Sequence, residues 1–207
     1  MKRRGRQGKT AAETAAQKKI VEAAIACIDR DGLSRVTIRG IAREAGVNSA
    51  AISYYFRSKE RLIEEALKTT LANAFGDWEV MLDGRGEDLE SRLGAVLREA
   101  LEGALRYPGI VKAHLYDTFV SGAANTLFIR RFSGFLSLLA RELQSRFPRR
   151  SAREIGADTV QLISAVLLPG FLPQLFRNAG GFDLADHGER ERYVDGVLRR
   201  FLSQPTK

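Results

Sequence analysis

The chain has 207 residues, of which 44% are hydrophobic and 28% are charged, and its formal net charge is +8. This composition is typical of a folded, soluble protein with one large or two small cores. The single cysteine, Cys27, cannot form a disulfide within the chain, and we expect it to be a small core residue. No apolar run resembles a signal peptide or a membrane span, so we expect a cytoplasmic protein with no membrane partner.

Helical periodicity dominates the N-terminal part, which begins with a basic segment over residues 1–13 that we expect to be disordered. Glycine and capping residues then divide the periodic sequence into short helices. We expect helices at 15–30, 37–44, 48–55 and 58–81. The first three of these form a predicted domain over 14–62.

The C-terminal part, 63–207, is predicted to be a second helical domain, reached through the long helix at 58–81. Pro108 suits the first turn of a helix, whereas Pro169 is expected to kink or end one. The expected helices are 89–106, 109–120, 125–147, 151–168 and 188–203. We find no convincing strand and no internal repeat, so the predicted fold class is all-α.

The segment from Thr37 to Lys59 has the spacing of a helix-turn-helix. Ala42 is small enough for a close helix crossing, and Gly46, four residues later, can adopt the positive φ that reverses the chain. Thr37 and Asn48 can cap the two helices by accepting from backbone N–H groups.

One face of the second helix in this segment is predicted to be small and polar. Ile52, Phe56 and Tyr55 should point inward, because residues three and four apart share a helix face. The outward residues are then Ser49, Ala50, Ser53 and Tyr54. Short hydroxyl and methyl side chains can approach base edges in a major groove. An ordinary solvated surface would show the same residues.

The distribution of charge favours the DNA interpretation. Residues 1–62 contain 14 Lys or Arg against 6 Asp or Glu, and the remaining residues contain 19 of each sign. All of the excess positive charge therefore accompanies the predicted helix-turn-helix, where it would attract a polyanion. The basic tail, with Lys2, Arg3, Arg4, Arg6 and Lys9, could enter a minor groove or remain solvated.

A longer pattern of small, apolar and capping residues extends over 15–68. It consists of Ile20, Ala23, Ala24, Gly32, Val36, Thr37, Ile41, Ala42, Ala45, Gly46, Val47, Ile52, Tyr55, Phe56, Ser58, Lys59 and Glu60. In this pattern the chain resembles the TetR family of transcriptional regulators. The resemblance implies an N-terminal three-helix DNA-binding domain and a C-terminal helical domain for ligand binding and dimerisation. Beyond residue 80 it concerns helix number and length only.

The resemblance also assigns site residues. It implies that Thr37 caps a helix and contacts phosphate, that Arg39 reaches phosphate or a base edge, and that Lys59 pairs with phosphate. The positions facing the bases are Ser49, Ala50 and Ser53, the last of which is tyrosine in many members. The aromatic positions that contact the backbone are Tyr54 and Tyr55. Asn48, Thr37, Arg39, Ser49, Ala50, Ser53, Tyr54, Tyr55 and Lys59 are thus the predicted DNA-binding residues.

Family members are homodimers, and the last predicted helix carries a matching apolar stripe. Its members are Tyr193, Val194, Val197, Leu198, Phe201 and Leu202. Helices 151–168 and 188–203 could form a four-helix bundle with a second copy. The alternative is that the stripe closes the core of a single chain.

A small-molecule effector is the other partner that the resemblance implies. The candidate pocket residues are Trp78, Tyr107, His114, Phe119, Phe128 and Phe132. Aromatic side chains suit a flat or apolar ligand, although rings at helical spacing are also common in ordinary cores.

The sequence opposes an enzyme. The two histidines, His114 and His187, have no second ligand at metal spacing, and the chain contains no nucleophile elbow and no phosphate-binding glycine loop. We therefore expect no metal, no cofactor and no catalytic residue. The interpretation is a repressor that binds a palindromic operator as a homodimer and is released by its ligand. The alternative is an architectural, nucleoid-organising protein without an effector.

Overall fold

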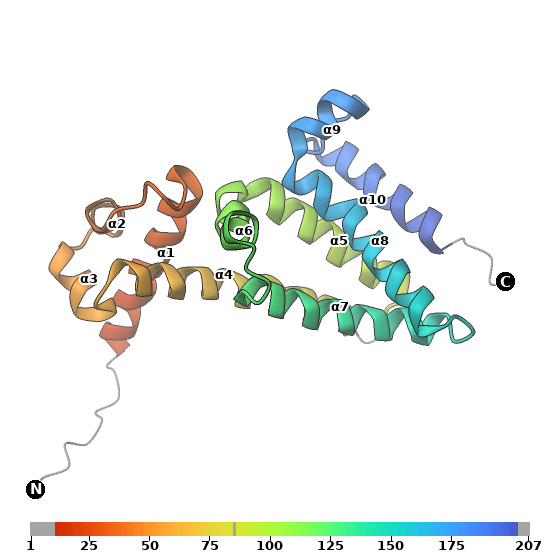
Figure 1. Ribbon diagram of the computed structural model, residues 1–207, viewed down its shortest axis with the longest axis horizontal. Helices are drawn as coiled ribbons and strands as arrows, with labels where there is room; N and C mark the ends of the chain where they lie inside the picture. The colour runs from red at the N-terminus through yellow and green to blue at the C-terminus, as the bar shows by residue number, and fades with distance from the viewer. Residues whose placement is uncertain (1–10, 85, 203–207) are drawn as a thin grey trace, which may run out of the picture. The chain divides into compact units, whose positions relative to one another are not determined.

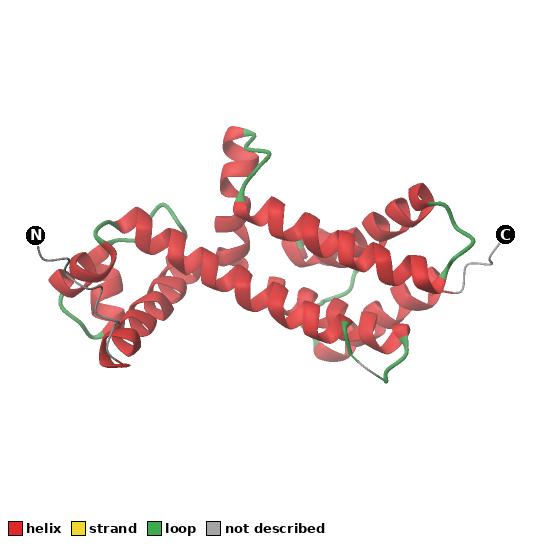
Figure 2. Cartoon of the chain, turned by 90° about the horizontal axis from the view of Figure 1, so that it is seen from below, coloured by secondary structure: helices red, strands yellow, loops and turns green. Residues whose placement is uncertain are grey.

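The structure is a computed structural model that describes residues 11–84 and 86–202. These residues form ten α-helices joined by loops, with no strand among them (Figures 1 and 2). The helices are α1 Ala11–Asp31, α2 Ile38–Ala45, α3 Ser49–Phe56, α4 Lys59–Leu82, α5 Leu89–Arg106, α6 Pro108–Ser121, α7 Leu127–Arg146, α8 Ala152–Phe171, α9 Pro173–Gly180 and α10 His187–Leu202. The predicted all-α class is confirmed.

Most helices lie within two residues of the predicted bounds, and the exceptions have physical causes. Helix α1 begins at Ala11 rather than residue 15, because alanine-rich sequence favours helix without contributing an apolar stripe. The expected disorder of the tail concerns residues 1–10, which lie outside the described residues. Helix α8 continues past the buried Pro169 to Phe171. Helix α9 was not predicted, and Pro173 occupies its first turn.

The described residues up to Thr70 form one compact unit. Its core consists of apolar side chains from α1 to α4 and from the loop before α2. The most buried are Ile20, Ala24, Cys27, Ile28, Val36, Ile41, Ile52, Leu62 and Ala66. Cys27 lies in this core as predicted, and its burial raises the pKa of the thiol. A thiol that stays protonated is a poor nucleophile, so this cysteine is structural.

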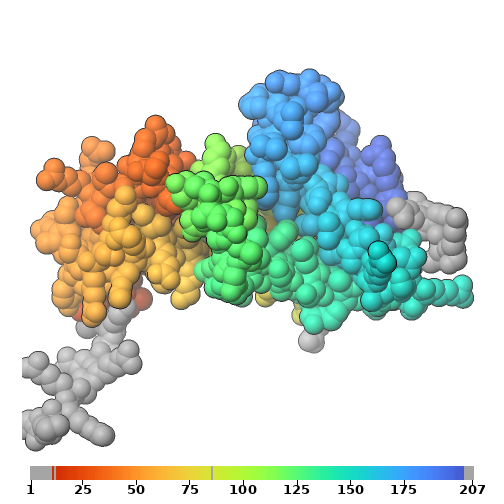
Figure 3. All heavy atoms as spheres, in the orientation of Figure 1, coloured from red at the N-terminus to blue at the C-terminus, as the bar shows by residue number. Residues whose placement is uncertain are grey.

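The residues from Leu71 onward form the second unit. Its core combines the C-terminal part of α4 with side chains from α5, α7, α8 and α10. Among the most buried are Phe75, Leu93, Leu97, Leu101, Phe135, Leu139, Leu162 and Val166. Helix α9 has no buried residue and stands out from the surface of this unit (Figure 3).

The hydroxyl of Tyr193 in α10 donates a hydrogen bond of 2.5 Å to the carbonyl oxygen of Ala165 in α8. Burial, the main effect, raises the pKa of this phenol, so the hydroxyl remains a donor at neutral pH. The bond joins two helices that also share apolar contacts in the core. Arg98 of α5 adds ion pairs to Glu191 and Asp195 of α10. Helix α10 is therefore fixed within its own chain.

Among the described helices, none by itself combines the length and apolar composition of a membrane span. Helices α8 and α9 reach those values only when taken together, and the two are bent by 97° at the break between them.

Candidate nucleic-acid interface and ligand region

The first helix of the predicted helix-turn-helix is fixed at both ends. Thr37 is its N-cap, and the threonine Oγ1 accepts a hydrogen bond of 3.0 Å from the Gly40 N–H. Gly46 ends α2 with a φ of 61°, the left-handed conformation that glycine adopts without a Cβ clash. Ala42, whose small side chain allows a close crossing, is buried. These features occur as the spacing predicts.

The second helix, α3, begins at its predicted cap. The Asn48 Oδ1 accepts a hydrogen bond of 2.5 Å from the Ala50 N–H. Ile52 is 1% exposed, and Tyr55 and Phe56 are half-buried, so the apolar face points into the unit as expected. This orientation fixes which residues of α3 remain outside.

The outward face of α3 is small and accessible. Ala50 and Ser53 are exposed, and Tyr54 is 72% exposed, with its ring edge-on to that of Tyr55 at 5.1 Å. Ser49 is half-buried, because the first residue of a helix lies against the preceding turn. The surface available to a base edge is therefore centred on Ala50, Ser53 and Tyr54.

Cationic and polar side chains flank this face in the sequence. Thr37 and Arg39 are exposed at the start of α2, and Lys59 is half-buried at the first position of α4. By contrast, Arg30 is engaged within the unit, because its guanidinium pairs with Glu44 at 2.9 Å and with Asp31 at 3.1 Å. Not every cation of this unit is thus available to phosphate.

Sequence reasoning missed Arg57. This residue ends α3 with a φ of 64°, which a residue with a Cβ seldom adopts, and its side chain is exposed. It lies two positions before Lys59, so it adds a cation at the corner between α3 and α4. The sequence signal was weak, because helix ends of this kind are usually marked by glycine.

Four of the six predicted pocket residues lie together in the second unit. His114 of α6 stacks on Phe128 of α7 at 6.0 Å between ring centroids, and Phe128 stacks on Phe132 at 5.4 Å. Trp78 of α4 meets Phe75 at 4.9 Å, and Phe75 lies 6.2 Å from Phe132. We call His114, Phe128, Phe132, Phe75 and Trp78 the aromatic group.

Two predicted pocket residues lie elsewhere. Phe119 is 78% exposed, because it follows the inward-facing part of α6 by one position and so points in another direction. Tyr107 is 44% exposed at the junction of α5 and α6, with the Arg106 guanidinium over its ring at 5.5 Å. Neither belongs to the aromatic group.

His114 is the titratable member of the aromatic group. Burial lowers the pKa of its imidazole from 6.5 to about 4, because the charged form would lose its hydration. The ring is therefore uncharged at neutral pH and offers one donor and one acceptor nitrogen.

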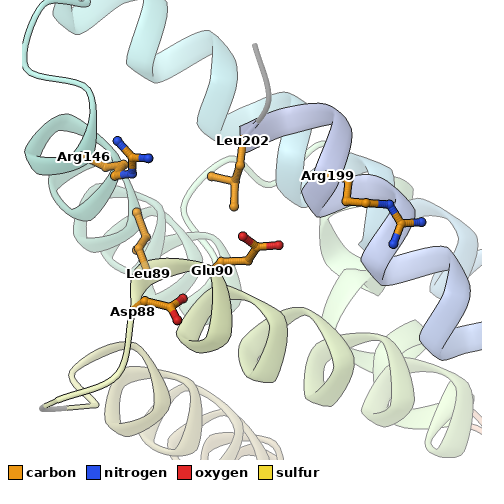
Figure 4. Close-up of a pocket in the computed structure, with 6 residues that line it drawn as sticks. All are labelled: Asp88, Leu89, Glu90, Arg146, Arg199 and Leu202. Atoms are coloured by element: carbon orange, nitrogen blue, oxygen red, sulfur yellow. The ribbon is translucent and has the colours of Figure 1, made fainter. Parts of the chain in front are cut away.

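A separate surface pocket of about 570 Å³ lies in the second unit (Figure 4). It is lined by Asp88, Leu89, Glu90, Arg146, Arg199 and Leu202. Side chains of both signs line it, and the Asp88 carboxylate is already used, because it caps α5 by accepting from the Ser91 N–H at 2.9 Å. None of the predicted ligand residues lines this pocket.

The predicted dimer stripe on α10 is largely used within the chain. Val194 is fully buried, Leu198 is 3% exposed and Phe201 is 7% exposed, all in the core of the second unit. Helix α8 instead presents an exposed row of small and apolar residues at helical spacing. The row comprises Ala157, Val160, Ser164 and Leu168, and Val160 is 54% exposed. The row on α8 is therefore more accessible than the α10 stripe.

The chain thus combines an N-terminal helical unit that contains a capped helix-turn-helix with a larger second helical unit. Residues 20–66 match the family of "Bacterial regulatory proteins, tetR family". The chain is 26% identical over 169 residues to the HTH-type transcriptional regulator BetI of Escherichia coli O45:K1. The match covers 73% of this chain and 80% of BetI.

Solved structures share the fold. A Mesorhizobium loti MAFF303099 protein described as a TetR-family transcriptional regulator gives a TM-score of 0.69 at 17% identity, covering 94% of this chain and 98% of that one. FadR of Bacillus subtilis, in complex with stearoyl-CoA, gives 0.61 at 16% identity, covering 91% and 98%. These matches identify a TetR-family DNA-binding domain at residues 20–66 and support a TetR-family transcriptional regulator. Its relatives are regulators that bind DNA, not enzymes.

Proposed function

We propose that this protein is a repressor that binds a palindromic operator as a homodimer and is released by a small, apolar or aromatic ligand. The observation that carries the proposal is the exposed face of α3. Ala50, Ser53 and Tyr54 lie outside, while the buried Ile52 fixes the helix on its unit. A helix held in this way can enter a major groove without reorganising.

The proposed roles divide between phosphate and base contacts. Ala50 and Ser53 are short enough to meet base edges, while Lys59, Arg39 and Thr37 contact the phosphates that set the position of the helix. Tyr54 and Tyr55 support the backbone contacts, and Asn48 and Ser49 orient the first turn of α3. We add Arg57 as a further phosphate contact, because its exposed guanidinium follows α3 directly.

A homodimer is supported by the exposed row on α8. Val160 and Leu168 are 54% and 48% exposed, and Ala157 and Ser164 in the same row are small enough for close helix packing. The same row on a second copy would give a two-fold contact, with the outer face of α10 beside it. Two-fold symmetry then predicts half-sites about 34 Å apart, or a multiple of that distance.

The proposed effector binds at the aromatic group in the second unit. Such a ligand weakens operator binding only if it prefers one arrangement of the protein over another. Helix α4 is suited to transmit the difference, because Lys59 belongs to its first turn and Trp78 lies four residues before its end. As a regulator of transcription, the protein would act in the bacterial cytoplasm, where the chromosome lies.

A genome-wide binding assay distinguishes this proposal from an architectural DNA-binding protein. We expect one or a few palindromic sites, with one near the protein's own gene. Hundreds of unrelated sites, unaffected by any small molecule, would contradict a ligand-responsive repressor and support the architectural alternative.

A further inference from the structure

The inner face of α6 carries a buried hydroxyl that no described residue satisfies. The Oγ1 of Thr118 is shielded from solvent and has no hydrogen-bond partner. Buried hydroxyls in helices often donate to the carbonyl oxygen four residues earlier. Thr159 of α8 does so, with its Oγ1 2.7 Å from the Ile155 oxygen. Because an unsatisfied buried hydroxyl destabilises the folded state, Thr118 requires an explanation.

The position of Thr118 connects it with the aromatic group. It follows His114 by four residues, so both side chains lie on the same face of α6. His114 is the first ring of a near-parallel stack. The angle between the planes of His114 and Phe128 is 22°, and that between Phe128 and Phe132 is 13°. The orphan hydroxyl therefore lies one helical turn from the end of a stack of flat rings.

No charged group contributes to the lowered pKa of His114. Burial is the cause of that lowered pKa, which shows that the ring lies away from water. A carboxylate or ammonium buried beside this ring would likewise lose its hydration. Ring faces attract cations to some extent, so an ammonium ligand should bind better than a carboxylate ligand.

Helix α6 contributes fewer buried residues than α4 or α7, the other two helices of the aromatic group. Of its residues only Ile110 and Ala113 are buried, and Phe119 and Val120 are 78% and 66% exposed. A small displacement of α6 would open space beside the stack at little cost in buried apolar area.

We propose that the effector is an uncharged aromatic molecule that extends the His114, Phe128 and Phe132 stack and forms a hydrogen bond with Thr118 through a neutral hydroxyl or carbonyl group. This inference rests on the proposed function and specifies its ligand class. The ring supplies most of the binding free energy by apolar burial, and the neutral polar group gives selectivity because it satisfies the buried hydroxyl.

The test uses three probes that share one ring system: 2-naphthylmethanol, 2-naphthoate and 2-naphthylmethylammonium. Calorimetric titration of the full chain should give the tightest binding for the alcohol, at least about tenfold above either charged probe. Thr118→Val should weaken binding of the alcohol about threefold to tenfold, the loss expected for one hydrogen bond. The variant should unfold at the same or a higher temperature, since it removes an unsatisfied hydroxyl.

The matched control is Thr159→Val, which makes the same change at a threonine whose hydroxyl is already bonded. It should leave the affinity for the alcohol unchanged. Equal or tighter binding of a charged probe, an unchanged affinity in Thr118→Val, or no binding of the alcohol would each overturn the inference.

Operator binding, measured by anisotropy in the same samples, separates this inference from the proposed function. If the alcohol binds through Thr118 but never releases the operator, the proposed ligand class is supported and the proposed release of the operator by a ligand at this site is contradicted. If another molecule releases the operator equally well from the wild type and from Thr118→Val, the repressor stands and the inference fails.

Discussion

The two units of this chain differ in how their chemistry is encoded. In the first unit, short-range features position the candidate nucleic-acid interface. Thr37 and Asn48 cap neighbouring helices, and Gly46 reverses the chain between them. In the second, the aromatic group draws residues from α4, α6 and α7, which are far apart in sequence. A site built from local features is recognisable across a family, whereas a site built from distant helices can diverge with its ligand.

The largest expected effect tests whether the second unit supplies dimerisation. Val160→Glu on α8 should leave the protein monomeric and weaken operator binding at least about a hundredfold, because paired half-sites lose their avidity. Sedimentation and operator titration measure the two effects. The matched control is Val80→Glu on α4, a valine that is 74% exposed, which should remain dimeric. A Val160→Glu dimer with normal operator affinity would place the interface elsewhere.

Acid should destabilise the second unit through His114. The folded-state pKa of about 4 lies below the ordinary value of 6.5, so unfolding takes up a proton between these values. The contribution of a neutral His114 is complete above pH 6.5 and is lost as the pH falls. By pH 4 the loss should reach about 3 kcal/mol.

Denaturant unfolding at pH 7 and pH 4 measures this loss. His114→Gln, which has no titrating ring, should lose less stability than the wild type over the same interval. His187→Gln serves as the control, because His187 is exposed at the start of α10, and it should behave as the wild type does. Identical pH dependence in all three proteins would show that His114 is not buried as described.

These two regions also differ in how far the sequence predicted them. Helix caps and the glycine turn depend on residues at most four positions apart, so they could be predicted from the sequence. The bounds of α2 and α3 were predicted from them. The burial of Val194 and Leu198 against their own chain could not be inferred, because an apolar stripe has the same pattern whether it faces a core or a partner. Helix α9 and the left-handed Arg57 were missed because neither carries a strong local signal. Thr118 became apparent only when its surroundings were known.

A smaller effect concerns the phosphate contacts of the first unit. Lys59→Ala should weaken binding several-fold to every DNA sequence and reduce the salt dependence by about one released ion for each subunit. Lys68→Ala is the matched control on the same helix, since Lys68 is exposed and only 4.0 Å from Glu65. A loss confined to the operator would show that Lys59 reads bases instead.

The central claim is that α3 reads the operator, and selection of preferred sites from randomised duplex DNA tests it most directly. The wild type should select one palindrome. Ala50→Leu should select a palindrome altered at the same base pair in both half-sites, whereas Ala72→Leu, an exposed alanine of α4 outside the first unit, should select the original one. An unaltered palindrome with Ala50→Leu would contradict the account.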